Sequence, residues 1–173
     1  MYNILFLLLL CTCTLITAAT SLTAQSFECI AQDFVSPRCD TVSSFIRLGS
    51  SKSAVRKVLA KAKSMQRVTE KRDRDTDSFT DENSDVLILV SYYENIATSV
   101  FIYIRHDMDS AGIALAAINE ELTQVFGPVM QSNGYYLQTC GKRAYARKVS
   151  ITDLGDEVED KYVTFALLEF PVR

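Results

Sequence analysis

The stretch Val86–His106, VLILVSYYENIATSVFIYIRH, decides the fold of this chain. Two runs rich in β-branched and aromatic residues flank a polar break at Glu94-Asn95, a pattern that predicts a β-hairpin. Neither face of these strands is fully polar, so we expect central strands with helices over one face. A loop, a second sheet or a partner protein would partly cover the other face. The two faces of the second strand carry Val100, Ile102 and Ile104, and Phe101, Tyr103 and Arg105, respectively.

Two amphipathic helices are predicted, at 52–65 before the hairpin and at 110–126 after it. The apolar face of the second helix includes Ile113 and Val125, and Gly127-Pro128 would end it. Further strands are predicted at 65–72, 135–140, 143–151 and 161–170, and acidic loops at 73–85 and 152–160. An irregular lead-in is expected at 25–47, with a short strand or turn at 41–48.

This order of elements predicts an α+β fold, an antiparallel β-sheet with two main helices packed on one face. Both halves of the chain, 41–106 and 109–173, run from helix to strands. A tandem helix-plus-strands repeat with one continuous sheet is therefore an alternative arrangement.

The N-terminus predicts export. Residues 2–19 carry no charge, and the apolar core Ile4–Leu10 precedes small residues that end in Leu22-Thr23-Ala24. We therefore expect a signal peptide at 1–24 and a single domain at 25–173, located in the periplasm or secreted. An uncleaved anchor helix is the alternative. No membrane span is expected after cleavage.

Three cysteines would remain in the mature chain. Cys29 and Cys39 could close a short disulfide loop, which leaves Cys140 as the odd thiol; pairing of Cys140 with either of them is the rival. There is no Cys-x-x-Cys, so neither a zinc knuckle nor a thioredoxin-type site is indicated.

Composition and motifs exclude several functions. A net charge of -3 argues against nucleic-acid binding, and no P-loop or Gly-x-Gly-x-x-Gly sequence indicates a nucleotide. No cofactor, metal site or catalytic residue is predicted. The alternative is an exported hydrolase with an unrecognised site near His106, the only histidine, or in the acidic loops. A further alternative is calcium-dependent binding through Asp73, Asp75, Asp77 and Asp81, although Ser78 and Ser84 replace the Gly and Glu of an EF-hand loop.

Candidate binding residues lie in two places. Arg143, Tyr145 and Arg147 would share one face of a strand, and a row of aromatic and guanidinium groups can anchor a protein partner. An ordinary edge strand protected by charge is the simpler interpretation. Phe101 and Tyr103 would form the second group if their face of the hairpin is bare.

The segment Leu48–Val55, LGSSKSAV, resembles the helix opening of small exported bacterial proteins with the β-lactamase-inhibitor-like fold, which include the BamE-type outer-membrane assembly lipoproteins. Phe126-Gly127-Pro128 is similar to the Gly-x-Pro that closes such helices. The chain departs from the lipoprotein pattern because it lacks a lipidation Cys. The resemblance implies protein binding on an α+β scaffold and assigns no site residue. We therefore expect a small exported, non-enzymatic protein that binds another protein or an envelope component.

Overall fold

The computed structural model describes residues 27–43, 46–61, 65–68, 75–81, 85–106, 108–127, 134–153 and 161–171. The predicted signal peptide at 1–24 lies outside these residues. The elements, in chain order, are α1 (Phe27–Phe34), β1 (Thr41–Ser43), β2 (Ile46–Arg47), α2 (Lys52–Lys61), β3 (Met65–Val68), β4 (Thr76–Asp81), β5 (Val86–Tyr93), β6 (Ile96–His106), α3 (Met108–Phe126), β7 (Tyr136–Cys140), β8 (Arg143–Asp153) and β9 (Lys161–Pro171). This is the predicted α+β class.

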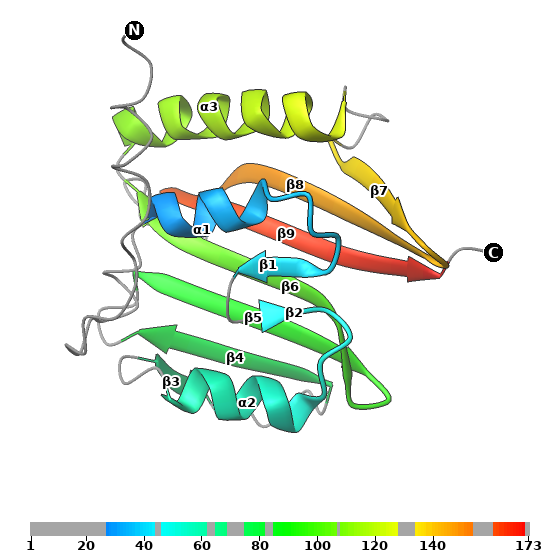
Figure 1. Ribbon diagram of the computed structural model, residues 1–173. Coiled ribbons are helices and arrows are strands. Elements are labelled where there is room, and N and C mark those ends of the chain that lie inside the picture. Colours follow the sequence, from blue (N-terminus) through cyan, green and yellow to red (C-terminus); the bar gives the residue numbers. More distant parts are fainter. Residues whose placement is uncertain are drawn as a thin grey trace, which may run out of the picture.

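Seven strands form one antiparallel sheet in the order β3-β4-β5-β6-β9-β8-β7 (Figure 1). Strands β3 to β6 follow one another across one half of the sheet, and β7 to β9 follow one another across the other. The halves meet where β6 pairs with β9, which is the last strand in the chain and yet lies near the middle of the sheet. Strands β1 and β2 form a separate pair in front of the sheet in Figure 1.

The predicted hairpin is confirmed as β5 and β6. Its turn residues Glu94 and Asn95 both have positive φ, 50° and 65°, which matches the right-handed twist of two paired strands. Side chains in β5 alternate between buried and half-buried positions. In β6, Val100, Ile102 and Ile104 are buried, whereas Phe101 and Tyr103 are half-buried, so the two faces of the sheet differ.

One face of the sheet contacts all three helices, and we call it the covered face. Phe34 of α1 packs edge-on against Phe165 of β9, with 5.2 Å between ring centroids. Arg56 of α2 forms an ion pair with Asp77 of β4. Helix α3 contacts β7, β8 and β9. The buried core lies here, and its sheet side chains are Phe79, Val86, Ile88, Val90, Tyr92, Ala97, Val100, Ile102, Ile104, Tyr136, Tyr145, Val149, Val163, Phe165 and Leu167.

A helix and a strand of the main sheet fall where no regular structure was predicted. Helix α1 replaces part of the irregular lead-in, because Ile30 and Phe34, four residues apart, both face the core. Strand β4 replaces part of the acidic loop at 73–85. In β4, Asp77, Phe79 and Asp81 are buried and alternate with half-buried threonine and serine, so this acidic segment has the period of a strand.

The helices bury fewer apolar residues than predicted. Helix α2 ends at Lys61, and Met65, the predicted end of that helix, begins β3 instead. In α3 the core contacts come from Ala111, Ile118 and Leu122, whereas Ile113 is 75% exposed. Gly127, with φ of 79°, ends α3 as predicted, and its N–H donates to the carbonyl of Thr123.

Within the described part of the chain, no helix has both the length and the apolar character needed to cross a lipid bilayer.

Candidate binding surface

The two groups of predicted binding residues lie on opposite faces of the sheet. In the strand register, Phe101 of β6 is level with Ala166 of β9, which is level with Lys148 of β8. Lys148 therefore shares a face with Phe101, whereas its neighbour Arg147 points to the covered face. The two groups cannot form a single binding site.

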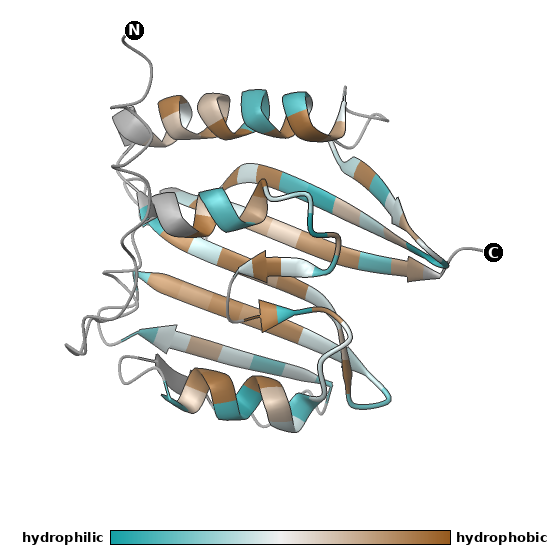
Figure 2. Cartoon of the chain, viewed as in Figure 1, coloured by the Kyte–Doolittle hydropathy of each residue, from teal (hydrophilic) through white to brown (hydrophobic). Residues whose placement is uncertain are grey.

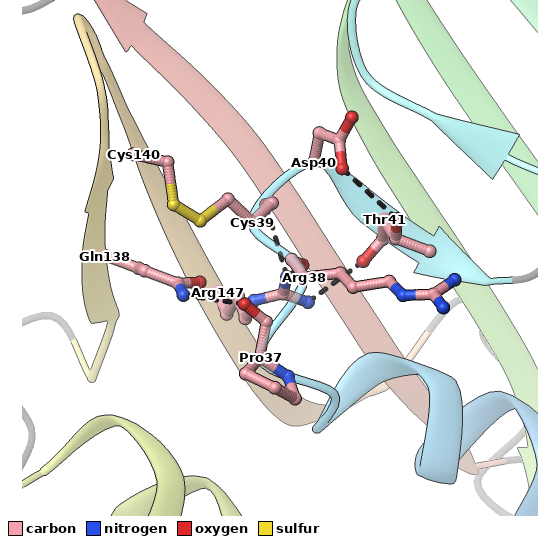
Figure 3. Close-up of a disulfide and its surroundings, with 8 residues drawn as sticks. All are labelled: Pro37, Arg38, Cys39, Asp40, Thr41, Gln138, Cys140 and Arg147. Carbon is pink, nitrogen blue, oxygen red and sulfur yellow. Dashed lines mark hydrogen bonds between the residues drawn. A yellow bond between two sulfur atoms is a disulfide. The ribbon is translucent and has the colours of Figure 1, made fainter.

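Arg147 is fully buried in the covered face, beneath the segment 34–41 that follows α1 (Figure 3). Its guanidinium donates to the carbonyl oxygens of Phe34 at 2.7 Å, Thr41 at 3.0 Å and Cys39 at 3.2 Å, and also to that of Arg38. The carbonyl of Phe34 belongs to the last residue of α1, where the helix leaves its carbonyls without intrahelical donors. Arg147 therefore fastens the N-terminal segment to the sheet.

Aromatic rings enclose the same guanidinium. The rings of Phe34 in α1 and Phe126 in α3 each lie 5.3 Å from the guanidinium carbon of Arg147. Burial lowers the pKa of Arg147 to about 10, and the nearby carboxylate of Asp40 partly opposes this shift. With no exposed surface, Arg147 cannot contact an external partner in this fold, which corrects its place in the predicted binding row.

Tyr145 and Arg143 lie on the covered face toward its rim. Tyr145 is also buried, and desolvation raises the pKa of its phenol while a hydrogen bond with Arg143 lowers it. Arg143 has a half-exposed side chain and forms an ion pair with Glu169 of β9 at 3.2 Å. Only Arg143 of the predicted row remains accessible, and it already has a partner.

The disulfide joins Cys39 to Cys140, with 6.3 Å between the Cα atoms (Figure 3). The predicted bond between Cys29 and Cys39 is therefore wrong, and its rival, a bond to Cys140, is correct. The physical reason is that Cys29 lies within α1, while the turn after α1 carries Cys39 to the end of β7. Gln138 of β7 supports this position by donating to the carbonyl of Pro37 at 2.9 Å. The disulfide and Arg147 thus hold the same segment to the sheet.

The other side of the sheet, which we call the open face, has an apolar centre on its middle strands. The contacts between the described helices and the sheet given above are made by side chains of the covered face, and none of them involves the open face. Strand β5 is hydrophobic along most of its length in Figure 2, so both of its faces are apolar. The central side chains of the open face, which we call the apolar patch, are Leu87, Leu89, Phe101, Tyr103, Ala166 and Leu168.

Phe101 and Tyr103 form the aromatic part of the apolar patch. The centroids of their rings are 6.4 Å apart, and the ring planes are inclined by only 18°, so the two rings stack nearly parallel to each other. Both side chains are half-buried, and partial desolvation raises the pKa of the Tyr103 phenol. Two apolar side chains that are less than half exposed, Leu137 of β7 at 39% and Phe170 of β9 at 46%, extend the open face toward one end.

The acidic residues considered for calcium have other contacts. Both carboxylate oxygens of Asp77 accept hydrogen bonds from Arg56, at 2.7 and 2.8 Å. Asp81 accepts one from the backbone N–H of Val86 at 2.9 Å. Asp73 lies outside the described residues. No cluster of three metal-binding side chains occurs among the residues that the structure describes.

The side chain of His106, the centre of the alternative hydrolase hypothesis, also lies outside the described part of the chain; its backbone ends β6 opposite Lys161.

Comparison with protein-family models, with curated proteins and with solved structures found no match to this chain. The open face must therefore be interpreted from its own residues. Its signal in the sequence was the lack of a polar face in the hairpin. The sequence held no comparable signal for the buried guanidinium of Arg147, because a cation between Ala146 and Lys148 on a strand also fits a solvated edge.

Proposed function

We propose that this protein is a small exported, non-enzymatic protein that binds another protein or an envelope component through the open face of its sheet. The observation that carries this proposal is the apolar patch on that face, with Phe101 and Tyr103 stacked at its centre. Contiguous apolar surface of this kind is costly to leave in water and commonly marks an interaction site. Aromatic side chains are also enriched in the cores of protein interfaces.

Export is supported by two features. A disulfide persists in oxidising compartments such as the periplasm or the extracellular space, and Cys39–Cys140 links segments 101 residues apart. The uncharged stretch at 2–19 has the composition of a signal peptide. We therefore place the mature protein, residues 25–173, in the periplasm or outside the cell.

We also propose that the scaffold is a tandem repeat, with α2 and α3 as the two main helices packed on the covered face. Helix α2 precedes β3 to β6, and α3 precedes β7 to β9, so each half runs from helix to antiparallel strands. This order agrees with the resemblance to the β-lactamase-inhibitor-like group, in which protein binding is the implied role.

Affinity capture tests the proposed function. The mature protein would be used as bait on its own envelope fraction, and bound species identified by mass spectrometry. Phe101→Ser removes the centre of the apolar patch, and Ile113→Ser changes a 75% exposed apolar residue on α3 as the matched control. We expect the same bound protein or envelope component with the wild type and with Ile113→Ser, and its loss with Phe101→Ser. Equal recovery with all three baits would contradict the proposal.

A further inference from the structure

The open face is nearly free of charge. Its residues whose side chains the structure describes are apolar residues, serine, threonine and tyrosine, apart from three charged groups. Arg105 and Asp85 form an ion pair at one end, with 3.7 Å between nitrogen and oxygen. The third charge belongs to Lys148 of β8.

Lys148 lies in the same cross-strand row as the apolar patch. The register aligns Leu89, Phe101, Ala166 and Lys148 on β5, β6, β9 and β8. Its ammonium lies 5.3 Å from the centroid of the Tyr135 ring, and the side chain is half-buried. Among the described residues, Lys148 forms no ion pair within 4.0 Å, so its aromatic neighbour is its main electrostatic contact. A half-buried cation of this kind gains from an external carboxylate that shares its partly desolvated position.

The described part of a second copy of the chain does not supply that carboxylate on its own open face. When two copies pack by a twofold axis, the same patch faces itself. Among the residues that the structure describes, the open face offers one carboxylate, Asp85, which already pairs with Arg105. Face-to-face packing of two copies would therefore bury two lysines, while the described carboxylate of each open face, that of Asp85, is already paired with Arg105.

We propose that the partner of the open face is a different protein, and that it presents an apolar surface with a carboxylate opposite Lys148. This inference rests on the proposed function and specifies the chemistry of its partner. The apolar patch would supply most of the buried area, and the pairing of Lys148 would set the orientation and exclude partners with a cation at that position.

Two synthetic amphipathic helical peptides, each of roughly 18 residues or five turns, test this chemistry. Both carry the same leucine stripe, with Glu beside the stripe in one and Lys at the same position in the other. Binding would be measured by fluorescence anisotropy and located by NMR shifts of the backbone amides. We expect shifts at Phe101, Tyr103 and Leu168, and the Glu peptide to bind about tenfold more tightly than the Lys peptide, which corresponds to about 1.4 kcal/mol.

Charge reversal provides the matched comparison. Lys148→Glu should reverse the order of the two peptides, whereas Lys142→Glu, in the exposed turn between β7 and β8, should leave it unchanged. Equal binding of both peptides at the open face would overturn the inferred pairing of a partner carboxylate with Lys148, but it would not contradict the proposed function. No shift of open-face amides with either peptide would contradict the proposed function itself. Concentration-dependent self-association that shifts the same amides would overturn the inference in favour of a second copy.

Discussion

The guanidinium of Arg147 donates a hydrogen bond to the carbonyl oxygen of Phe34, 113 residues earlier in the chain. This contact joins strand β8 to the end of α1 and places a cation where the sequence suggested a surface residue. A buried charge is costly unless its hydrogen bonds are satisfied, and here backbone carbonyls of segment 34–41 accept hydrogen bonds from both terminal nitrogens of the guanidinium, while Nε has no hydrogen-bond partner among the described residues. The N-terminal segment is therefore an integral part of the core.

Loss of this cation should strongly destabilise the protein. Arg147→Met keeps the apolar stem and removes the donors, so several buried carbonyls lose their partner. We expect the free energy of unfolding to fall by about 3 kcal/mol or more, measured by urea denaturation. Arg143→Met is the control, because the ion pair of Arg143 with Glu169 is partly exposed and should contribute at most about 1 kcal/mol. Equal losses in the two variants would show that burial of Arg147 has no special energetic role.

The disulfide gives the second prediction. Cys140→Ser opens a loop of 101 residues, for which loop-closure entropy predicts a loss of about 4 to 5 kcal/mol in the free energy of unfolding. Cys29→Ser keeps the Cys39–Cys140 bond and should have a smaller effect. A non-reducing peptide map identifies the linked peptides. Recovery of a peptide pair that contains Cys29 would contradict the observed pairing.

The ion pair between α2 and β4 gives the third prediction. The Asp77 side chain is fully buried and that of Arg56 is 39% exposed. The hydrogen bond with Asp77 also raises the pKa of Arg56, so the guanidinium is charged at neutral pH. Arg56→Met removes two donors from a buried carboxylate and should cost about 2 kcal/mol in thermal or urea unfolding. Lys57→Met, on the exposed side of the same helix, is the control and should have little effect.

Calcium should not stabilise the protein through its acidic segment. Asp77 and Asp81 point to the covered face and accept hydrogen bonds from Arg56 and Val86. They are therefore turned away from any ion in solution. We expect the same Tm, measured by differential scanning fluorimetry, with calcium added and with a chelator. A rise in Tm that requires calcium and disappears in Asp77→Asn would restore the calcium hypothesis.

Ionisation of Tyr103 gives a pH dependence. Partial burial raises the pKa of this phenol above its ordinary value of 10. A group whose pKa is raised on folding stabilises the folded state below the unfolded pKa, and this contribution is lost as the pH rises through the folded pKa. The wild type should therefore lose more stability than Tyr103→Phe between about pH 8 and about pH 11. Urea unfolding at both pH values measures the difference, and identical pH slopes would show that the phenol is not desolvated.

The sequence predicted the hairpin, the α+β class and the strands of the second half, because each has strong local periodicity. Prediction from the sequence failed for segments whose structure depends on contacts with residues far away in the chain. Asp77 and Asp81 resemble a solvated loop until folding brings Arg56 to Asp77 and the backbone of Val86 to Asp81, and α1 is a short helix that is held by Phe165 and Arg147. The pairing of Cys39 could not be predicted, since it depends on the position of β7. The candidate binding residues were chosen by residue type, but only the strand register shows that Phe101 and Tyr103 lie on the opposite face of the sheet from Arg147.

The central position of β9 has a consequence for synthesis of the chain. Strand β6 is complete at His106, whereas β9 begins at Lys161, so β6 waits for its partner while the intervening residues emerge. At about 5 to 20 residues per second, this delay is roughly 3 to 11 seconds. During that time the nascent chain presents an unpaired edge with apolar side chains on both faces, which is the structure most prone to intermolecular strand pairing. Binding of a chaperone to β6 during translation or export would protect this edge until the second half arrives.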